Sequence, residues 1–500
     1  MKFERASGIL LHPTSLPSRH GIGDLGQSAY EFIDFMVRSG QTLWQILPLG
    51  PTGYDHSPYT MNFSAFAGNP LMVSLEKLVE DGLLNADEVV PLENAKPNRV
   101  EFSRVIPHKT QMLRQAFERF AGEGDADYDK FCQEQAWWLD DFVLFMALLE
   151  ANDGKPWSQW ERSIARREPE AMEAKSEELK TEIAYHRFVQ FKFFEQWMAL
   201  RQYVNDKNIQ IIGDVSIYVC HNSSDVWAHP QLFKLDPETL ESAFIAGVPP
   251  DYFSETGQLW GNPVYDWEKC EESGFEWWTS RFKATLQYVD WVRVDHFRGF
   301  EAYWQVPASE ETAMNGEWVK APGDAFFETL AEKLGSLPVL AEDLGIITPE
   351  VEALRDRFEF PGMKILMFAF GGDPESPHLP DNYVTNCIVY SGTHDNDTAI
   401  GWWQTLPDHE KQFLAQYLGY SSPDEITEIN WELIRTAIAS VADLAIVPLQ
   451  DLLSLDGSAR MNDPSKIPGN WRWRYERSDM LTDEVSDRLL NLTREHNRLP

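Results

Sequence analysis

The sequence has 500 residues, 43% hydrophobic and 24% charged, which is typical of a globular protein with a large core. Its formal net charge of −36 argues against binding to nucleic acid, whose phosphates require clusters of Lys and Arg, and against anionic membrane surfaces. The four cysteines are far apart without CxxC spacing, so we expect reduced thiols in the cytoplasm, with neither a zinc site nor a disulfide framework. The N-terminal apolar run is too short for a signal peptide, and no 18-residue apolar stretch follows.

Eight short apolar segments predict buried strands. In chain order they are GILLH (8–12), TLWQILPLG (42–50), IQIIGDVSIYV (209–219), YVDWVRVDHF (288–297), LPVLAEDLG (337–345), GMKILMFAF (362–370), NCIVYSGTHD (386–395) and LAIVPLQDLL (444–453). Stretches with helical periodicity separate most of them, which favours a parallel sheet covered by helices on both faces. Because there are eight segments, we predict an α/β fold with a closed (β/α)₈ TIM-type barrel; a doubly wound open sheet is the alternative.

Two intervals between these segments are too long for a single crossover helix. We expect one barrel domain spanning 1–500, interrupted by a largely helical subdomain over 70–185 and a loop-rich subdomain over 220–285.

Acidic residues end three of the predicted strands: Asp295 in WVRVDHF, Glu342 in VLAEDLG and Asp395 in SGTHDND. The C-terminal ends of barrel strands form one face, so these carboxylates should meet there. Cleavage of a glycosidic bond uses two carboxylates, one attacking the anomeric carbon and one protonating the leaving oxygen. Arg293 precedes Asp295 on the same side of its strand and would keep that carboxylate ionised. The alternative is that these residues are helix caps or surface pairs.

Two further stretches have the composition of loops around a site. SPYTMNFSAFAGNP (57–70) follows the second strand, and AGVPPDYFSETGQLWGNPVYDW (246–267) places Tyr252, Gln258, Trp260 and Asn262 between glycine hinges. A loop with hinges and aromatic side chains can close over a substrate and stack on it. Either stretch could instead be a well-packed surface loop.

Two other features indicate structure rather than function. GIGDLG (21–26) matches the dinucleotide motif GxGxxG, but a segment with two prolines separates it from the first strand, so a tight loop is predicted. Three adjacent Trp pairs are expected in helix cores rather than as platforms for sugars: Trp137–Trp138, Trp277–Trp278 and Trp402–Trp403.

Motifs along nearly the whole chain resemble one family. They include GILLHPTSLPSRHGIGDLG, WQILPLGPTGYDHSPY, RVDHFRGF, LAEDLG and ARMNDPS, and the most specific combination is AGVPPDYFSETGQLWGNP (246–263) with SGTHDNDT (391–398). In these motifs the chain resembles the amylomaltases, also called disproportionating enzymes or 4-α-glucanotransferases, of the α-amylase superfamily.

The resemblance implies a retaining double displacement without a metal or other cofactor. Asp295 would be the nucleophile, Glu342 the general acid/base and Asp395 a stabiliser of the transition state. The loop that carries Trp260 would cover the acceptor side. The residues expected to bind substrate are Ser57, Tyr59, Asp214, Gln258, Trp260, Arg293, His296 and His394.

The expected function is therefore transfer of α-1,4-glucan segments between maltooligosaccharides by a cytoplasmic enzyme. The alternatives are an α-amylase-type hydrolase, with water as acceptor, and a non-catalytic glucan-binding protein that keeps the barrel. The non-catalytic alternative predicts a lost carboxylate, and all three carboxylates are present. Neither nucleic acid nor a membrane is an expected partner, and the oligomeric state stays open.

Overall fold

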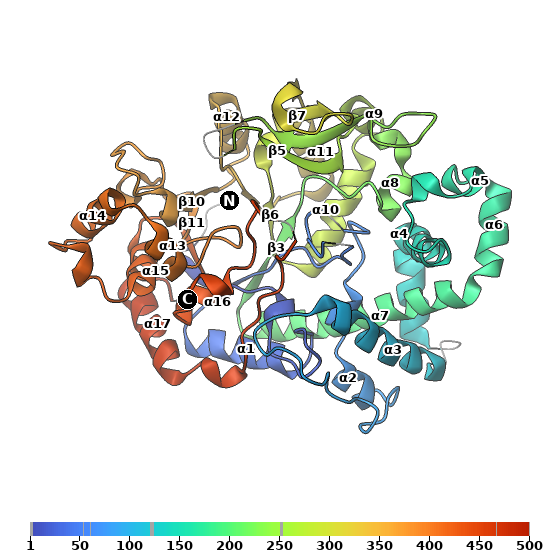
Figure 1. The fold of residues 1–500 in the computed structure, drawn as a ribbon, viewed down its shortest axis with the longest axis horizontal. Helices are drawn as coiled ribbons and strands as arrows, with labels where there is room; N and C mark the ends of the chain where they lie inside the picture. The colour runs from blue at the N-terminus through green and yellow to red at the C-terminus, as the bar shows by residue number, and fades with distance from the viewer. Residues whose placement is uncertain are drawn as a thin grey trace.

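Eight parallel strands close into a barrel in the order β1-β12-β11-β10-β9-β6-β3-β2 (Figure 1). The computed structural model describes residues 4–53, 55–60, 62–120, 125–250, 254–466 and 468–499. The barrel strands are β1 (Ala6–Leu10), β2 (Leu43–Gln45), β3 (Gln210–Val215), β6 (Trp291–Val294), β9 (Val339–Ala341), β10 (Gly362–Ile365), β11 (Cys387–Tyr390) and β12 (Leu444–Pro448). Seven of the predicted apolar segments each contain one barrel strand, and the first, 8–12, overlaps β1. The predicted (β/α)₈ barrel is confirmed, and the closed sheet replaces the open alternative.

The barrel strands are short and almost wholly buried. Every residue of β2, β9, β11 and β12 is buried, as expected for strands with side chains inside the barrel and helices outside it. Close packing of β1 on β2 requires a glycine, since a Cβ atom added to Gly8 would lie 1.9 Å from the carbonyl oxygen of Leu43.

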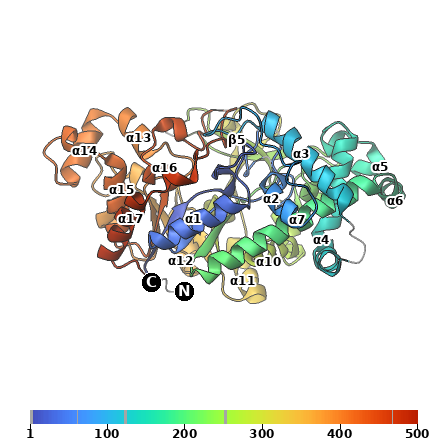
Figure 2. The same cartoon turned by 90° about the horizontal axis from the view of Figure 1, so that it is seen from below.

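Helices surround the barrel and extend away from it on one side (Figures 1 and 2). The outer ring consists of α1 (Gln27–Arg38), α7 (Lys180–Asp206), α10 (Glu276–Tyr288), α11 (Gly323–Leu334), α12 (Pro349–Arg357), α15 (Ile429–Ala439) and α17 (Asp483–Glu495). Other helices follow several strands: α8 (Ser224–Ala228), α9 (Trp267–Glu272), α13 (Ala399–Thr405), α14 (Asp408–Tyr417) and α16 (Leu449–Leu452). Residues 21–26 form the loop that leads into α1, as predicted for GIGDLG.

Further helices lie in the long interval between β2 and β3. They are α2 (Leu75–Glu80), α3 (Phe102–Arg119), α4 (Ala126–Ala151), α5 (Arg162–Ala165) and α6 (Pro169–Glu178). We propose that they form the subdomain expected over 70–185. The second proposed insertion, 220–285, ends inside α10 and not at a helix boundary. In the described part of the chain, no helix is both long and apolar enough to span a membrane.

A second, antiparallel sheet lies outside the barrel, with the order β5-β4-β7-β8. Its strands are β4 (Phe244–Val248), β5 (Gln258–Pro263), β7 (Ala302–Pro307) and β8 (Glu317–Lys320). The prediction of a glycine-hinged loop over 246–267 is therefore wrong for β4 and β5, which pair as a hairpin. Gly247 serves that pairing, because a Cβ atom there would lie 2.3 Å from the carbonyl oxygen of Gln258.

Arg498 holds together the barrel seam between its first and last strands. Its side chain is fully buried, and burial lowers the pKa of the guanidinium to about 9. It donates hydrogen bonds to five backbone carbonyl groups, those of Ala6, Ile438, Ser440, Ala442 and Asp443. One side chain thus joins β1 to the segment that leads into β12.

Candidate active site

The predicted carboxylates meet at the C-terminal mouth of the barrel. Asp295 directly follows β6, Glu342 directly follows β9, and Asp395 lies a few residues beyond β11. They are near enough to act on one another, since the charge of Asp395 raises the pKa of Asp295 and the charge of Asp295 raises that of Glu342. The prediction that these three side chains share one face is therefore consistent with their electrostatic contacts.

Arg293 connects two carboxylates. Its Nη1 lies 2.6 Å from Oδ2 of Asp214 on β3, and its Nη2 lies 3.1 Å from Oδ1 of Asp295. The hydroxyl of Tyr59 also donates to Oδ2 of Asp214, at 2.9 Å. The pair formed by Arg293 and Asp214 is buried, so the guanidinium is fixed in place and presents its second nitrogen to Asp295.

Burial and charge act differently on the carboxyl groups. Burial raises the pKa of Glu342 well above its ordinary value, Arg293 opposes this, and Asp295 adds to it. Burial also raises the pKa of Asp295, but Arg293, which bonds this carboxylate directly, is the largest opposing influence. Burial raises the pKa of Asp214 to about 7 against the same guanidinium. Glu342 is thus the group favoured to carry a proton, and Asp295 has the cation contact of a nucleophile.

Glu342 is held by the backbone that follows Asp295. The N–H of His296 donates to Oε2 of Glu342 at 2.7 Å, and the N–H of Phe297 donates to its backbone carbonyl at 3.0 Å. His296 has φ 50° and ψ 51°, the left-handed conformation that is unusual for a residue other than glycine. The turn after β6 therefore fixes the carboxyl of Glu342 relative to Asp295.

Glu342→Gln is expected to stabilise the protein at neutral pH. The folded state raises the pKa of Glu342, so the stability contributed by this group is greatest below about pH 4, the unfolded pKa, and falls as pH rises toward the folded value. Gln does not titrate, so the substitution removes the cost of protonating this carboxyl, or of burying its charge, on folding; Tm at pH 7 should rise by on the order of 1–2 °C, with the difference vanishing near pH 4. Thermal unfolding at both pH values measures this; the exposed Glu352→Gln is the matched control. Equal Tm values at pH 7 would contradict it.

Asp395 is positioned by a segment to which sequence reasoning assigned no role. Asn462 donates from Nδ2 to Oδ1 of Asp395 at 2.6 Å, and Arg460 donates to its backbone carbonyl at 2.7 Å. On the other side, Nε2 of His394 lies 3.4 Å from Oδ2. The stretch ARMND belongs to the motifs that carry the family resemblance, but it has no strand or helix pattern from which its position could be inferred.

Aromatic rings and neutral imidazoles line the mouth. The ring of Tyr59 stacks on His394 with centroids 5.1 Å apart and an interplanar angle of 6°, and Trp471 lies 5.6 Å from Tyr59. Burial lowers the pKa of His394 to about 4 and that of His296 to about 3, so both are uncharged at neutral pH. Within the described residues, Nδ1 of His394, Nε2 of His296 and Oδ1 of Asp214 have no hydrogen-bond partner. Buried polar atoms without a partner are suited to bind hydroxyl groups of a ligand.

The remaining predicted residues have different positions. The ring of Trp260, on β5, meets that of His296 edge-on at 4.8 Å, and its Nε1 donates to Gln258 at 3.3 Å. Oγ of Ser57 accepts hydrogen bonds from two backbone N–H groups, those of Tyr59 and Thr60, so it shapes the loop that carries Tyr59. Tyr252 lies outside the described residues.

Two further polar residues inside the barrel were missed by the sequence analysis. The hydroxyl of Tyr390 donates to Oε1 of Gln45 at 2.7 Å, and both side chains are buried. Arg293 and Asp214 both influence the pKa of Tyr390, which places this pair beside them. The signal in the sequence was Gln45, a polar residue in the otherwise apolar strand LWQ.

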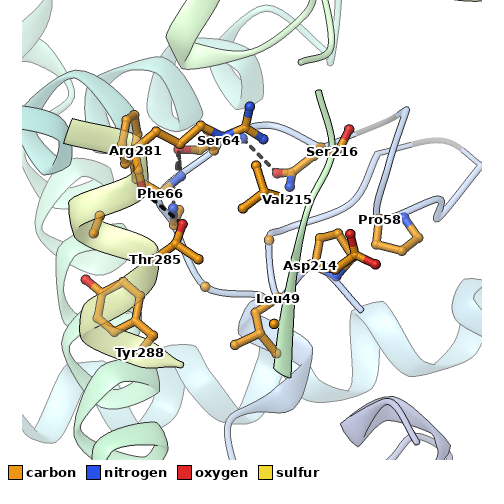
Figure 3. Close-up of a pocket in the computed structure, with 18 of the residues that line it drawn as sticks. Leu49, Pro58, Ser64, Phe66, Asp214, Val215, Ser216, Arg281, Thr285 and Tyr288 are labelled. Carbon is orange, nitrogen blue, oxygen red and sulfur yellow. Dashed lines mark hydrogen bonds between the residues drawn. The ribbon is translucent and has the colours of Figure 1, made fainter. Parts of the chain in front are cut away.

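A cavity of about 80 Å³ lies beside the site, between β3 and α10 (Figure 3). Val215 and Ser216 come from the β3 side, and Arg281, Thr285 and Tyr288 come from α10. Its volume is well below that of ordinary ligand pockets, so it is too small for an oligosaccharide. No cluster of three or more His, Cys, Asp or Glu side chains in the described part of the chain could hold a metal ion.

A family model described as 4-alpha-glucanotransferase matches residues 11–480. The chain belongs to the 4-alpha-glucanotransferase family. A 4-alpha-glucanotransferase of Synechocystis sp. is 54% identical over 99% of this chain and 98% of its own, and one of Thermus thermophilus is 48% identical over 95% of each. The solved structure of amylomaltase from Streptococcus agalactiae in complex with acarbose is 40% identical, with a TM-score of 0.95, and covers 99% of this chain and 100% of its own.

These similarities confirm the predicted resemblance to amylomaltases and the predicted 4-alpha-glucanotransferase activity. Neither a hydrolase nor a non-catalytic glucan-binding protein is favoured by them.

Proposed function

We propose that this 4-alpha-glucanotransferase moves α-1,4-glucan segments between maltooligosaccharides by a retaining double displacement. Asp295 is the nucleophile, Glu342 the general acid/base and Asp395 the stabiliser of the transition state. The observation that carries the proposal is that two neighbouring carboxyl groups have different surroundings: Arg293 contacts Asp295, whereas burial favours a proton on Glu342. The acarbose bound by the amylomaltase from Streptococcus agalactiae supports an oligosaccharide as substrate.

Two chemical steps follow from these roles. Asp295 attacks the anomeric carbon while Glu342 gives its proton to the departing glycosidic oxygen, which forms a glycosyl ester and releases the shortened glucan. A hydroxyl of the acceptor then attacks the same carbon from the opposite side. Glu342 takes the proton of that hydroxyl, and Asp295 leaves as a carboxylate, so the anomeric configuration is retained overall.

The polar atoms without partners provide the proposed donor-side contacts. His296, His394 and Oδ1 of Asp214 would bind sugar hydroxyls, and Tyr59 would bind through its ring and its hydroxyl. Trp260 and Gln258 on β5 would contact the acceptor. We also propose a cytoplasmic location, which suits the four free cysteines.

The separation of the two carboxyl groups tests the retaining mechanism. In a crystal structure with a bound maltooligosaccharide, we expect Asp295 and Glu342 to lie about 5–5.5 Å apart, because the nucleophile must reach the anomeric carbon directly. A separation near 9 Å in that complex would leave room for a water molecule and would indicate inversion instead.

The products formed from pure maltotriose distinguish transfer from hydrolysis. We expect glucose together with a ladder of longer oligomers and little net rise in reducing ends, measured by chromatography and a reducing-end assay. Trp260→Ala should lower transfer by about tenfold, the loss of one aromatic contact to the acceptor, and hydrolysis by less. Trp318→Ala, on β8 of the same small sheet, is the control. Only glucose and maltose, with reducing ends rising in step, would identify a hydrolase.

A further inference from the structure

A second concave surface lies between α4, α8 and the N-terminal part of α10, and we call it the α4–α10 groove. It has a volume of about 250 Å³. Its aromatic wall consists of Phe66, Trp137, Trp138 and Trp277. None of the residues proposed for the active site lines it, so the groove is a separate feature of the molecule.

Trp137 is unusual among the aromatic residues of the groove. The two members of this Trp pair were both expected in a helix core, but only Trp138 is buried, at 4% exposure, whereas Trp137 is 48% exposed. Phe66 meets the ring of Trp137 edge-on at 4.8 Å and supports it from one side. Among the described residues the other exposed Trp is Trp318, and the guanidinium of Arg298 covers its ring at 3.8 Å. Trp137 therefore presents a supported indole surface to solvent.

The polar rim of the groove carries negative charges and hydroxyl groups. Its acidic side chains are Asp141 and Glu276 and its hydroxyl groups are those of Ser273 and Ser280, while Asp225 and Ser224 lie buried beneath them. The nearby cation Arg167 forms an ion pair with Asp141 and stacks on Trp227 at 4.2 Å. Burial lowers the pKa of His229, which also lines the groove, below its ordinary value, so this side chain adds no positive charge at neutral pH.

This chemistry selects a class of ligand. Carboxylates repel anions, and an indole face alone would accept many apolar molecules. A sugar ring combines an apolar face that stacks on Trp with hydroxyl groups that donate to carboxylates and exchange hydrogen bonds with serines. A neutral carbohydrate matches both parts of the groove.

We propose that the α4–α10 groove is a second binding site for α-1,4-glucan, in which Trp137 stacks on a sugar ring and the acidic rim binds its hydroxyls. The identity of the ligand rests on the proposed function. A glucan held there would keep other parts of the same chain at a high local concentration near the active site. The groove also adjoins the loop that carries Tyr59, since Asp225 accepts a hydrogen bond at 2.9 Å from the backbone N–H of Ala65.

Binding can be tested without turnover. In the Asp295→Asn variant, calorimetric titration with maltoheptaose should show two classes of sites, and adding Trp137→Ala should remove one of them. In gels that contain amylose, Trp137→Ala should weaken the retention of the enzyme by about fivefold to tenfold, while Trp137→Phe restores part of it. Trp403→Ala, on α13 at the opposite side of the molecule, should leave retention unchanged (Figure 1).

Activity on a short substrate separates this site from the active site. The rate of transfer from maltotriose should stay within about twofold of wild type in Trp137→Ala, because a trisaccharide gains nothing from a remote tether. A single class of sites in Asp295→Asn, or unchanged retention of Trp137→Ala in amylose gels, would overturn the proposal. Absence of transfer from maltotriose in the wild-type enzyme would instead overturn the proposed function, and the titration of Asp295→Asn would still report on the groove.

Discussion

Asp295→Asn should abolish glucan transfer from every donor, with kcat lowered by on the order of 10⁴-fold or more. An amide cannot form the glycosyl ester, so neither a natural glucan nor a donor with an activated leaving group can complete the first step. The isosteric side chain keeps the neighbouring ion pair of Arg293 with Asp214, and the site should therefore stay folded. Steady-state rates with maltotriose and with α-maltosyl fluoride measure the effect.

The control for this prediction is Asp356→Asn, which removes a carboxylate that is 65% exposed on the outer surface. It should leave both rates near those of the wild type. Transfer by Asp295→Asn within tenfold of the wild-type rate would rule out Asp295 as the nucleophile.

Glu342→Gln should lower the rate of glycosyl-ester formation by an amount that depends on the leaving group. A glucan alkoxide is a poor leaving group and needs the proton of Glu342, so transfer from maltotriose should fall by about 10²–10⁴-fold. Fluoride needs less assistance, so formation of the glycosyl ester from α-maltosyl fluoride should fall far less. Pre-steady-state release of fluoride isolates that first step.

The outcome for Glu342 is decided by comparing the two donors in one variant. Equal losses on maltotriose and on the fluoride would mean that Glu342 does not protonate the leaving group. In that case the hydrogen bond from His296 to Oε2 would have only a structural purpose.

The barrel was predictable from sequence because its strands are buried on both faces. Runs such as VLA and CIVY are apolar without alternation, and a polar cluster follows each of them. The antiparallel sheet was not predictable in the same way, since it lies outside the barrel and its strands are partly exposed. In β8, EWVK, three of the four residues are exposed, so no burial pattern distinguishes this strand from a loop.

The site shows the same division. Asp295 and Glu342 were predictable because the C-terminal ends of barrel strands lie on one face. Residues that end different strands in the sequence therefore lie close together in the structure. The partners of Asp395 were not, because Asn462 and Arg460 come from an irregular segment that reaches the mouth only through tertiary packing. Ser57 adds a contact that its sequence does not show: its Oγ accepts two backbone hydrogen bonds within its own loop, which leaves its O–H free to donate to a ligand.

The seam between β1 and β12 has a consequence for how the protein is made. Ala6 pairs with Leu444, so the strand synthesised first finds one of its two neighbours only after more than four hundred further residues have been added. At about 5–20 residues per second, β1 waits on the order of tens of seconds on the ribosome with an open edge, whereas β11 waits for β12 only on the order of seconds. Arg498, which fastens the seam, emerges later still. The nascent chain is therefore exposed to edge-to-edge association during synthesis, and shielding of that edge by chaperones is the step on which its yield should depend.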